Sequence, residues 1–367
     1  MARVDVVVVG GGAMGATSAW RLARSGRSVV LCEQFAPVHD RGSSHGATRI
    51  FRVAYRDPRY TALALRALPL WRELEDATGD VLLEQVGQLD HGRASAVAEV
   101  ADSLAAAGRP HEVLSPAAAA ERWPGMCFDD AVVVSPEGGR CWADRTVAAA
   151  WRAAGTAGAD LRPATAVRRV EVRGEGAVVH LPDGELEADV VVVAAGAWAA
   201  GLLDGVVELP PLLVTEEQPS HFRALDPAAD WPSFLHHRPP ADGVDRPLGF
   251  DAYGLLTPGE GVKVGGHGTG ATVDPDHRSG IDPGRAAAES AYVAEWFPGL
   301  DPRPVSSTPC LFTSTPDDHF VLDRRGPVVV CSPCSGHGFK FVPAVAREVE
   351  LLVGGAAQGD AAWRLPG

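Results

Sequence analysis

The sequence predicts a mixed α/β fold, in which a doubly wound sheet of mostly parallel strands is combined with a second unit built on a mostly antiparallel sheet. A β-branched apolar run at residues 4–9 leads directly into a glycine-rich turn, which is how such a parallel sheet usually begins. A second run of this kind occupies residues 188–198. The 367-residue length exceeds one typical domain of roughly 150 residues, so we expect two domains.

Composition limits the classes of partner. Apolar residues make up 46% and charged residues 22%, which is ordinary for a globular protein. The formal net charge of −14 argues against binding to nucleic acid or to an anionic membrane surface. No apolar run approaches the ~18–20 residues of a membrane span, and the six scattered cysteines do not resemble a disulfide framework. We therefore expect a cytoplasmic protein.

The first strand is followed by every element of a dinucleotide-binding unit. The turn Gly10–Gly15 reads Gly-Gly-Gly-Ala-Met-Gly, residues 16–24 have helical composition, and residues 28–32 form a second apolar strand that ends at Glu33. Glycine gives the turn its tight shape, allows the backbone to approach a pyrophosphate, and lets the helix pack closely on the sheet. The helix N-terminus then faces the anion, and the acid accepts hydrogen bonds from a ribose diol. The acid disfavours NADP but leaves NAD and FAD open.

The apolar run at 188–198 favours FAD over NAD. It ends in a turn of small residues that contains Ala195 and Gly196 and is followed by Trp198. In many flavoproteins with two dinucleotide-type domains, a late strand of this kind returns to the cofactor sheet. An ordinary core strand is the alternative.

Lysine is almost absent from this chain. Only Lys263 and Lys340 are lysines among the 33 basic residues. The composition favours arginine wherever any cation would suffice. The two remaining lysines therefore point to positions where a compact ammonium is required.

Several segments, in this order along the chain, resemble the monomeric sarcosine oxidase and N-methyltryptophan oxidase family of flavin amine oxidases, within the D-amino acid oxidase superfamily. The resemblance runs from the first strand to about residue 350 and places both lysines on functional positions. The segments that carry it are Gly-Ser-Ser-His-Gly-Ala-Thr-Arg at 42–49, Arg-Trp-Pro-Gly at 122–125, Gly-Val-Lys-Val-Gly-Gly-His at 261–267, Cys310, Asp-His-Phe at 318–320, and Ser-Gly-His-Gly-Phe-Lys at 335–340.

The resemblance implies a role for individual residues. Cys310 corresponds to the cysteine that forms a thioether to the flavin, so we expect covalent FAD. Arg52 and Lys340 correspond to the pair that binds the substrate carboxylate, which suits a planar fork and a point charge. Lys263 corresponds to the lysine beside the flavin that activates dioxygen, where a fixed ammonium stabilises the developing anion.

The resemblance assigns further residues, although the chain departs from the family pattern at some positions. His45 and Arg49 match residues that lie against the flavin ring, and His267 matches an active-site histidine. Many relatives have a histidine where this chain has Ser44. The region from about 205 to 260 aligns poorly, so Tyr253 matches the family's active-site tyrosine only after a gap.

The glycine turn and the resemblance together assign a set of residues to FAD. We expect no metal site, since no histidine or cysteine cluster has ligand spacing. The FAD set is Gly10, Gly12, Ala13, Met14, Gly15, Glu33, Gln34, Arg41, Ser43, Ser44, Ala195, Gly196, Trp198, Cys310, Gly336, His337, Gly338, Phe339 and Lys340.

The cofactor domain is expected to be discontinuous. We assign residues 1–85, 142–208 and 306–367 to it, and 86–141 and 209–305 to the substrate domain. Segments 94–107 and 285–296 read as amphipathic helices. Segments 224–247 and 273–284 are rich in Pro, Asp and Gly and read as surface loops, one of them a candidate lid.

The function expected from the sequence is oxidation of a secondary-amine amino acid by an FAD-dependent monomer. A hydride equivalent passes to the flavin, and dioxygen is reduced to hydrogen peroxide. N-methyl amino acids such as sarcosine come first, and cyclic imino acids such as pipecolate or a piperideine carboxylate, including a tailoring step of secondary metabolism, come second. The alternatives are an amino acid dehydrogenase with another electron acceptor and a nucleotide-binding protein without turnover.

Overall fold

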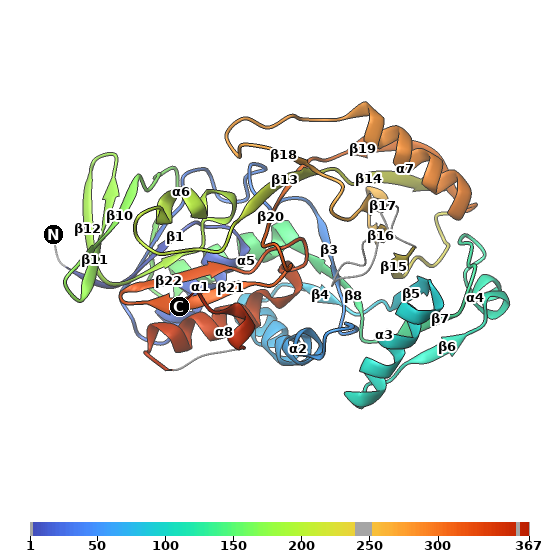
Figure 1. The fold of residues 1–367 in the computed structure, drawn as a ribbon, viewed down its shortest axis with the longest axis horizontal. Coiled ribbons are helices and arrows are strands. Elements are labelled where there is room, and N and C mark those ends of the chain that lie inside the picture. Colours follow the sequence, from blue (N-terminus) through green and yellow to red (C-terminus); the bar gives the residue numbers. More distant parts are fainter. Residues whose placement is uncertain (1–2, 239–251, 357–359, 367) are drawn as a thin grey trace.

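The computed structural model describes residues 3–238, 252–356 and 360–366. Two eight-stranded sheets lie side by side along the long axis of the molecule, each with its own helices (Figure 1). Several segments far apart in the sequence contribute strands to each sheet. The mixed α/β fold predicted from the sequence is confirmed.

The first sheet is the predicted parallel sheet. β1 pairs in parallel with β12 on one side and β2 on the other, β2 continues to β9, and β12 also pairs in parallel with β22. Antiparallel β10–β11 and β21 extend the sheet at its margins. Its strands are β1 (Val4–Val9), β2 (Val29–Cys32), β9 (Asp160–Arg162), β10 (Arg169–Arg173), β11 (Gly176–Leu181), β12 (Gly184–Val193), β21 (Val321–Arg325) and β22 (Val328–Ser332).

The glycine turn joins β1 to the helix α1 (Ala13–Arg24) as predicted. Gly10 has φ +100°, a left-handed conformation that residues other than glycine rarely adopt. A Cβ on Gly15 would lie 1.8 Å from the carbonyl oxygen of Gly10, so only glycine lets the helix pack this closely on the turn. The late strand predicted at 188–198 is confirmed as β12, although it ends at Val193.

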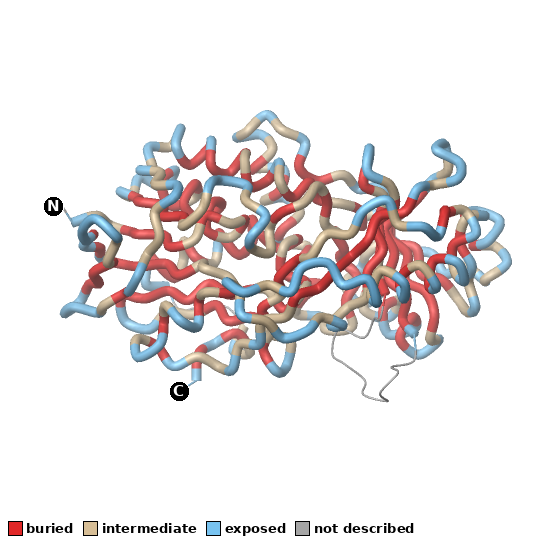
Figure 2. The backbone as a smooth tube through the Cα atoms, turned by 90° about the horizontal axis from the view of Figure 1, so that it is seen from above, coloured by how far each residue is buried: buried red, intermediate tan, exposed pale blue. Residues whose placement is uncertain are grey.

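Helices cover both faces of this sheet. On one face α1, α2 (Pro58–Thr78), α5 (Ala143–Thr156) and α8 (Val342–Val353) build the larger core cluster with apolar side chains of the strands. On the other face α6 (Ala199–Leu203) packs in a second, smaller cluster. Residues of the strands are therefore mostly buried, whereas many residues of the loops and of the outer helix faces are exposed (Figure 2).

The second sheet is mostly antiparallel, as predicted. Its order is β19-β14-β17-β16-β15-β5-β7-β6, and the β15–β5 pair is the parallel one among the described strands. Helices α4 and α7 supply side chains to the core on one face. The elements are β5 (Gln88–Gly92), β6 (Glu112–Leu114), β7 (Val132–Ser135), β14 (Ser220–Ala224), β15 (Ser233–His237), β16 (Ala252–Thr257), β17 (Gly261–Gly266), β19 (Leu300–Ser307), α3 (Ala94–Ala106), α4 (Pro116–Arg122) and α7 (Pro283–Trp296).

The amphipathic helices predicted at 94–107 and 285–296 are confirmed as α3 and α7. The prediction that 224–247 is a surface loop is wrong in part, because β15 lies within it and all five of its residues are buried. Proline, aspartate and glycine around this strand concealed a short apolar run, Ser-Phe-Leu-His-His. Residues 239–247 of that prediction lie outside the described residues.

Two three-stranded sheets connect the halves. One contains β13 (Leu213–Glu217), β18 (Ala271–Thr272) and β20 (Cys310–Ser314), and the other β3 (Thr48–Phe51), β4 (Leu83–Glu84) and β8 (Gly139–Trp142). Three short 3₁₀ helices complete the elements: η1 (Gly196–Trp198), η2 (Phe339–Phe341) and η3 (Ala361–Trp363). Among the helices of the described residues, none is both long and apolar enough to cross a bilayer. The predicted domain boundaries stay a prediction.

Candidate active site

A cavity of about 460 Å³ lies between the two sheets, within the size range of small-molecule sites. One wall comes from the carboxyl ends of β1, β2, β12 and β22, where ligands of open α/β sheets usually bind. The other wall comes from β14, β15, β16 and β17 of the second sheet. The cavity therefore lies between strand ends of the kind that usually bind a ligand and side chains of the antiparallel sheet.

The glycine turn forms one end of the cavity. The N–H of Ala13 donates to Ser44 Oγ at 3.1 Å, and the indole N–H of Trp151 donates to the Gly11 carbonyl at 2.8 Å. Gly12 lines the cavity, and a Cβ on it would lie 3.2 Å from Ser44 Oγ. The turn is thus held from outside, while its inner face stays accessible to a phosphate group.

Glu33 lies buried at the end of β2. One carboxylate oxygen accepts from the Gly11 N–H at 2.6 Å. The other accepts from the Phe35 N–H at 2.9 Å and lies 3.5 Å from His39 Nε2. These contacts fix the carboxylate at the cavity wall, as a ribose-binding acid requires.

The structure brings most of the predicted cofactor residues to this one cavity. Two do not line it. Gly15 packs α1 against the turn, and the guanidinium of Arg41 lies 5.4 Å from the centre of the Phe35 ring. Those that line the cavity are Gly10, Gly12, Ala13, Met14, Glu33, Gln34, Ser43, Ser44, Ala195, Gly196, Trp198, Cys310, Gly336, His337, Gly338, Phe339 and Lys340.

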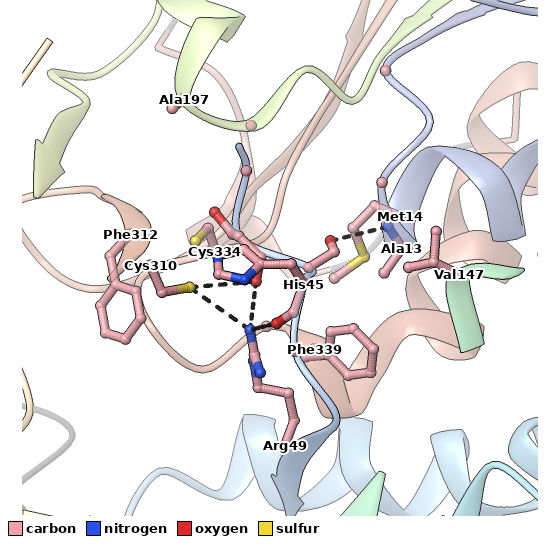
Figure 3. Close-up of a pocket in the computed structure, with 18 of the residues that line it drawn as sticks. Ala13, Met14, His45, Arg49, Val147, Ala197, Cys310, Phe312, Cys334 and Phe339 are labelled. Carbon is pink, nitrogen blue, oxygen red and sulfur yellow. Dashed lines mark hydrogen bonds between the residues drawn. The ribbon is translucent and has the colours of Figure 1, made fainter. Parts of the chain in front are cut away.

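Arg49 donates hydrogen bonds to several backbone carbonyls near Cys310 (Figure 3). Its guanidinium donates to the carbonyls of Ser43 at 2.9 Å, His45 at 2.7 Å and Thr48 at 2.9 Å. The same group lies 3.7 Å from Cys310 Sγ, and that thiol lies 3.7 Å from the Ser43 carbonyl.

Lys263 extends from β17 into the cavity and is buried, with 6% of the residue exposed. Its ammonium donates to the Thr48 carbonyl at 2.9 Å, the same oxygen that accepts from Arg49. Burial, and then the nearby Arg49 cation, lowers the pKa of Lys263 to about 7. Its charge therefore changes near neutral pH.

Arg52 and Lys340 both lie over the ring of Tyr55. The Arg52 guanidinium lies 3.7 Å and the Lys340 ammonium 5.7 Å from the ring centre. Lys340 donates to the His337 carbonyl at 2.7 Å, and Arg52 donates to the Ala54 carbonyl at 3.2 Å. Burial, and then Arg52, holds the pKa of Lys340 well below its usual range. A guanidinium and a lysine side chain buried in one wall favour a bound anion, and such an anion would in turn favour the charged form of the lysine.

The remaining predicted residues also line the cavity. Burial lowers the pKa of His45 to about 4, and its Nε2 has no hydrogen-bond partner among the described residues. A buried unpaired nitrogen at the cavity fits a site that receives a polar cofactor. His267 lies 5.9 Å from the Phe312 ring, ring centre to ring centre, and burial raises the pKa of Tyr253.

Sequence reasoning missed part of the second wall. His221, Leu235, Leu255 and Glu260 line the cavity as well. Alternation along the strands brings His221 and Leu235 to it, whereas their neighbours Phe222 and Phe234 pack in the core on the opposite face. No local motif marks these residues, because they lie in or near the region where the family pattern is weakest.

Comparison with known proteins gives consistent results. Residues 5–351 match the family DAO, described as FAD dependent oxidoreductase. The chain is similar to monomeric sarcosine oxidase of Bacillus sp. (strain NS-129), with 32% identity covering 95% of this chain and 92% of the relative. It is also similar to N-methyl-L-tryptophan oxidase of Yersinia pestis (strain Pestoides F), with 28% identity over 95% and 94% of the two chains.

Solved structures agree on the fold. NikD, described as an unusual amino acid oxidase essential for nikkomycin biosynthesis, superposes in its open form with a TM-score of 0.88. Its identity to this chain is 26%, and the match covers 100% of this chain and 98% of NikD. L-proline dehydrogenase from P. horikoshii has a TM-score of 0.83 at 22% identity, covering 97% and 94%, which shows a shared fold.

Proposed function

Because the chain belongs to the DAO family of FAD-dependent oxidoreductases, we propose that it is an oxidase of secondary-amine amino acids. N-methyl amino acids such as sarcosine are the first candidates, and cyclic imino acids are the second. The products are an imine, which water hydrolyses, and hydrogen peroxide. Bound FAD supplies the two-electron acceptor of this reaction.

The placement of Arg52 and Lys340 in one wall of the cavity, both over the ring of Tyr55, supports the proposal. A carboxylate held by a guanidinium fork and an ammonium is fixed in position and orientation, and so is the amine attached to its α-carbon. His267 and Tyr253 line the same cavity and offer polar groups to the amine.

The cofactor end of the cavity fits FAD. The glycine turn at the start of α1 offers backbone N–H groups to a pyrophosphate, and Glu33 offers carboxylate oxygens to a ribose. Cys310 lies in contact with Arg49, so its thiol is positioned for covalent attachment to the flavin. Lys263 places a buried ammonium where dioxygen would gain negative charge.

The test is direct. Purified protein is assayed with sarcosine, N-methyltryptophan, pipecolate and proline, while peroxide and oxygen consumption are measured together. Equal amounts of oxygen consumed and peroxide formed support the oxidase. Turnover only with an artificial electron acceptor would instead identify the dehydrogenase, and a protein that binds FAD but turns over no substrate would end the proposal.

Covalent attachment is tested by acid precipitation, which leaves a covalent flavin in the pellet and releases a bound one. We expect a yellow pellet for the unmodified protein and a colourless one for Cys310→Ser. Cys334→Ser is the matched control, because this second thiol also lines the cavity and lies near Cys310 (Figure 3). Loss of the covalent flavin from the Cys334 variant instead would contradict the assignment.

A tailoring oxidase of a cyclic imino acid is the second candidate. The likeness to NikD, at 26% identity over the whole chain, favours it. Preference for pipecolate or a piperideine carboxylate over sarcosine in the same panel would select it. The expectations of a monomer and of a cytoplasmic location stay predictions.

A further inference from the structure

We propose a binding site for a divalent transition-metal ion, formed by His91, His236 and Asp129 on the face of the second sheet that lies opposite the active-site cavity. One ligand atom from each residue lies within 4.8 Å of the other two. Imidazole nitrogen and carboxylate oxygen are ligands that Zn²⁺ accepts. The site is separate from the flavin chemistry proposed above.

The strands explain why the two histidines meet. His91 on β5 is directly opposite His236 on β15, in the parallel pair of this sheet. Side chains alternate along a strand, so Leu235 points into the active-site cavity while His236 points to the other face. Asp129 lies in the segment between α4 and β7 and brings its carboxylate to the same place.

His91 is the strongest sign of an unidentified ligand. It is 0% exposed, and neither of its ring nitrogens has a hydrogen-bond partner among the described residues. Buried polar side chains nearly always have such a partner, and an ion or a water supplies it where the protein does not. An imidazole left unpaired in the core would cost stability.

His236 is already oriented for a ligand. Its Nδ1 lies 2.9 Å from the hydroxyl of Tyr292 on α7, so a proton on Nδ1 leaves Nε2 with a free electron pair. Metal-bound histidines are commonly oriented in this way through their second nitrogen. Burial lowers the pKa of both histidines, and the neutral imidazole is the form that binds a metal.

The surroundings suit a closed site with one opening. The rings of His91 and His236 stack with their centres 4.1 Å apart, and Trp296 covers His236 with its ring centre at 4.4 Å. Phe128 lies 5.3 Å from His91. Asp129 is exposed, so an ion can enter from solvent on its side. The guanidinium of the exposed Arg238 lies 5.6 Å from the centre of the Tyr292 ring. The carboxylate of Asp129 offsets this positive charge.

Binding requires the imidazole rings to turn out of their stack, because rings inclined by only 23° direct their lone pairs side by side and not at one ion. Two ligands at the usual Zn–N length in a tetrahedral site are roughly 3.3 Å apart, so the three atoms would draw together, and water would take the fourth position. The ion would then join β5, β15 and the segment before β7. We expect a structural role, since the active-site cavity lies on the opposite face of the sheet.

The experiment uses untagged, FAD-loaded protein stripped with EDTA and titrated with Zn²⁺, followed by metal analysis and by the thermal midpoint. We expect one bound Zn²⁺ per chain with a micromolar or tighter Kd, and a midpoint several degrees higher. Co²⁺ in place of Zn²⁺ should give the visible absorption of a four-coordinate site. Oxidase activity should be equal with and without the ion.

Variants distinguish this site from adventitious binding. Asp129→Asn changes an exposed side chain and should weaken Zn²⁺ binding roughly 10- to 100-fold with the fold intact, and His91→Phe should abolish it. His277→Asn is the matched control, because His277 forms an exposed pair with Asp274 at 3.4 Å. Binding that survives His91→Phe, or that His277→Asn removes, would overturn the proposal. So would a stripped protein that takes up no Zn²⁺.

Discussion

The two walls of the active-site cavity work by different means. The wall from the first sheet offers backbone groups, glycines and one buried carboxylate, whose partners are themselves backbone N–H groups. The wall from the second sheet carries the buried ammonium of Lys263 and the phenol of Tyr253. One wall therefore offers mainly backbone groups and shape, whereas the other holds side chains whose pKa values burial shifts.

The largest expected effect separates the two lysines. Lys263→Met should slow reoxidation of the reduced enzyme by dioxygen roughly 100- to 1,000-fold, because the buried ammonium that stabilises the developing anion is lost. Its flavin reduction by substrate should change little. Stopped-flow measurement of the two half-reactions checks this. Lys340→Met is the control and should impair substrate binding instead; equal loss of both half-reactions in the Lys263 variant would contradict the assignment.

Gly15→Ala tests the first wall. The added Cβ would lie 1.8 Å from the Gly10 carbonyl oxygen, so the turn must move, at a cost of roughly 1–3 kcal/mol. We expect bound FAD to fall roughly tenfold or more, measured by flavin absorbance per chain. Gly354→Ala is the control, since this glycine lies outside the cavity and its Cβ would come no closer than 3.4 Å to another atom, the Leu351 carbonyl oxygen. The interpretation of the turn fails if Gly15→Ala keeps its full cofactor content.

Arg52→Ala tests the carboxylate site between the walls. Loss of a charge-assisted hydrogen bond should raise KM roughly 10- to 100-fold. The rate of reoxidation should stay unchanged, because Lys263 is intact. Arg52→Lys should recover only part of the affinity, since an ammonium cannot reproduce the planar fork. A large drop in kcat at unchanged KM would argue against carboxylate binding by this residue.

The smallest expected effect is a pH dependence of the second wall. The pKa of Lys263 is lowered to about 7, so its ammonium is present below that pH and lost above it. The rate constant of reoxidation should therefore fall about tenfold between roughly pH 6 and pH 8. Lys263→Arg should remove the dependence, because arginine stays charged. A flat profile in the unmodified enzyme would show that this titration does not govern the rate.

Sequence reasoning succeeded where the signal is local. The strand β1, the glycine turn and α1 follow from adjacent residues, since a left-handed Gly10 and a close-packed Gly15 depend on their immediate neighbours. Family motifs brought Lys263 and Lys340 to attention, and both line the cavity. Reasoning failed at β15, where polar and turn-forming neighbours concealed a buried strand.

Sequence reasoning could not have found the residues of the second wall that no motif marks, or the proposed metal site. His91 and His236 are 145 positions apart, and only the parallel pairing of β5 with β15 puts them side by side. No spacing rule covers such a pair. The expectation of no metal site rested on local spacing and is replaced by our proposal.

The sequence by itself determined the α/β fold and the glycine turn, and it supplied the residues that we propose for carboxylate and dioxygen chemistry. Local backbone conformation and short motifs carry that information, because they depend on neighbouring residues. The tertiary structure alone decided that Lys263 and Arg49 share the carbonyl of Thr48, and that Arg52 and Lys340 lie over one ring. Charges change their pKa and cooperate only when distant strands bring them together away from water, which no local pattern records.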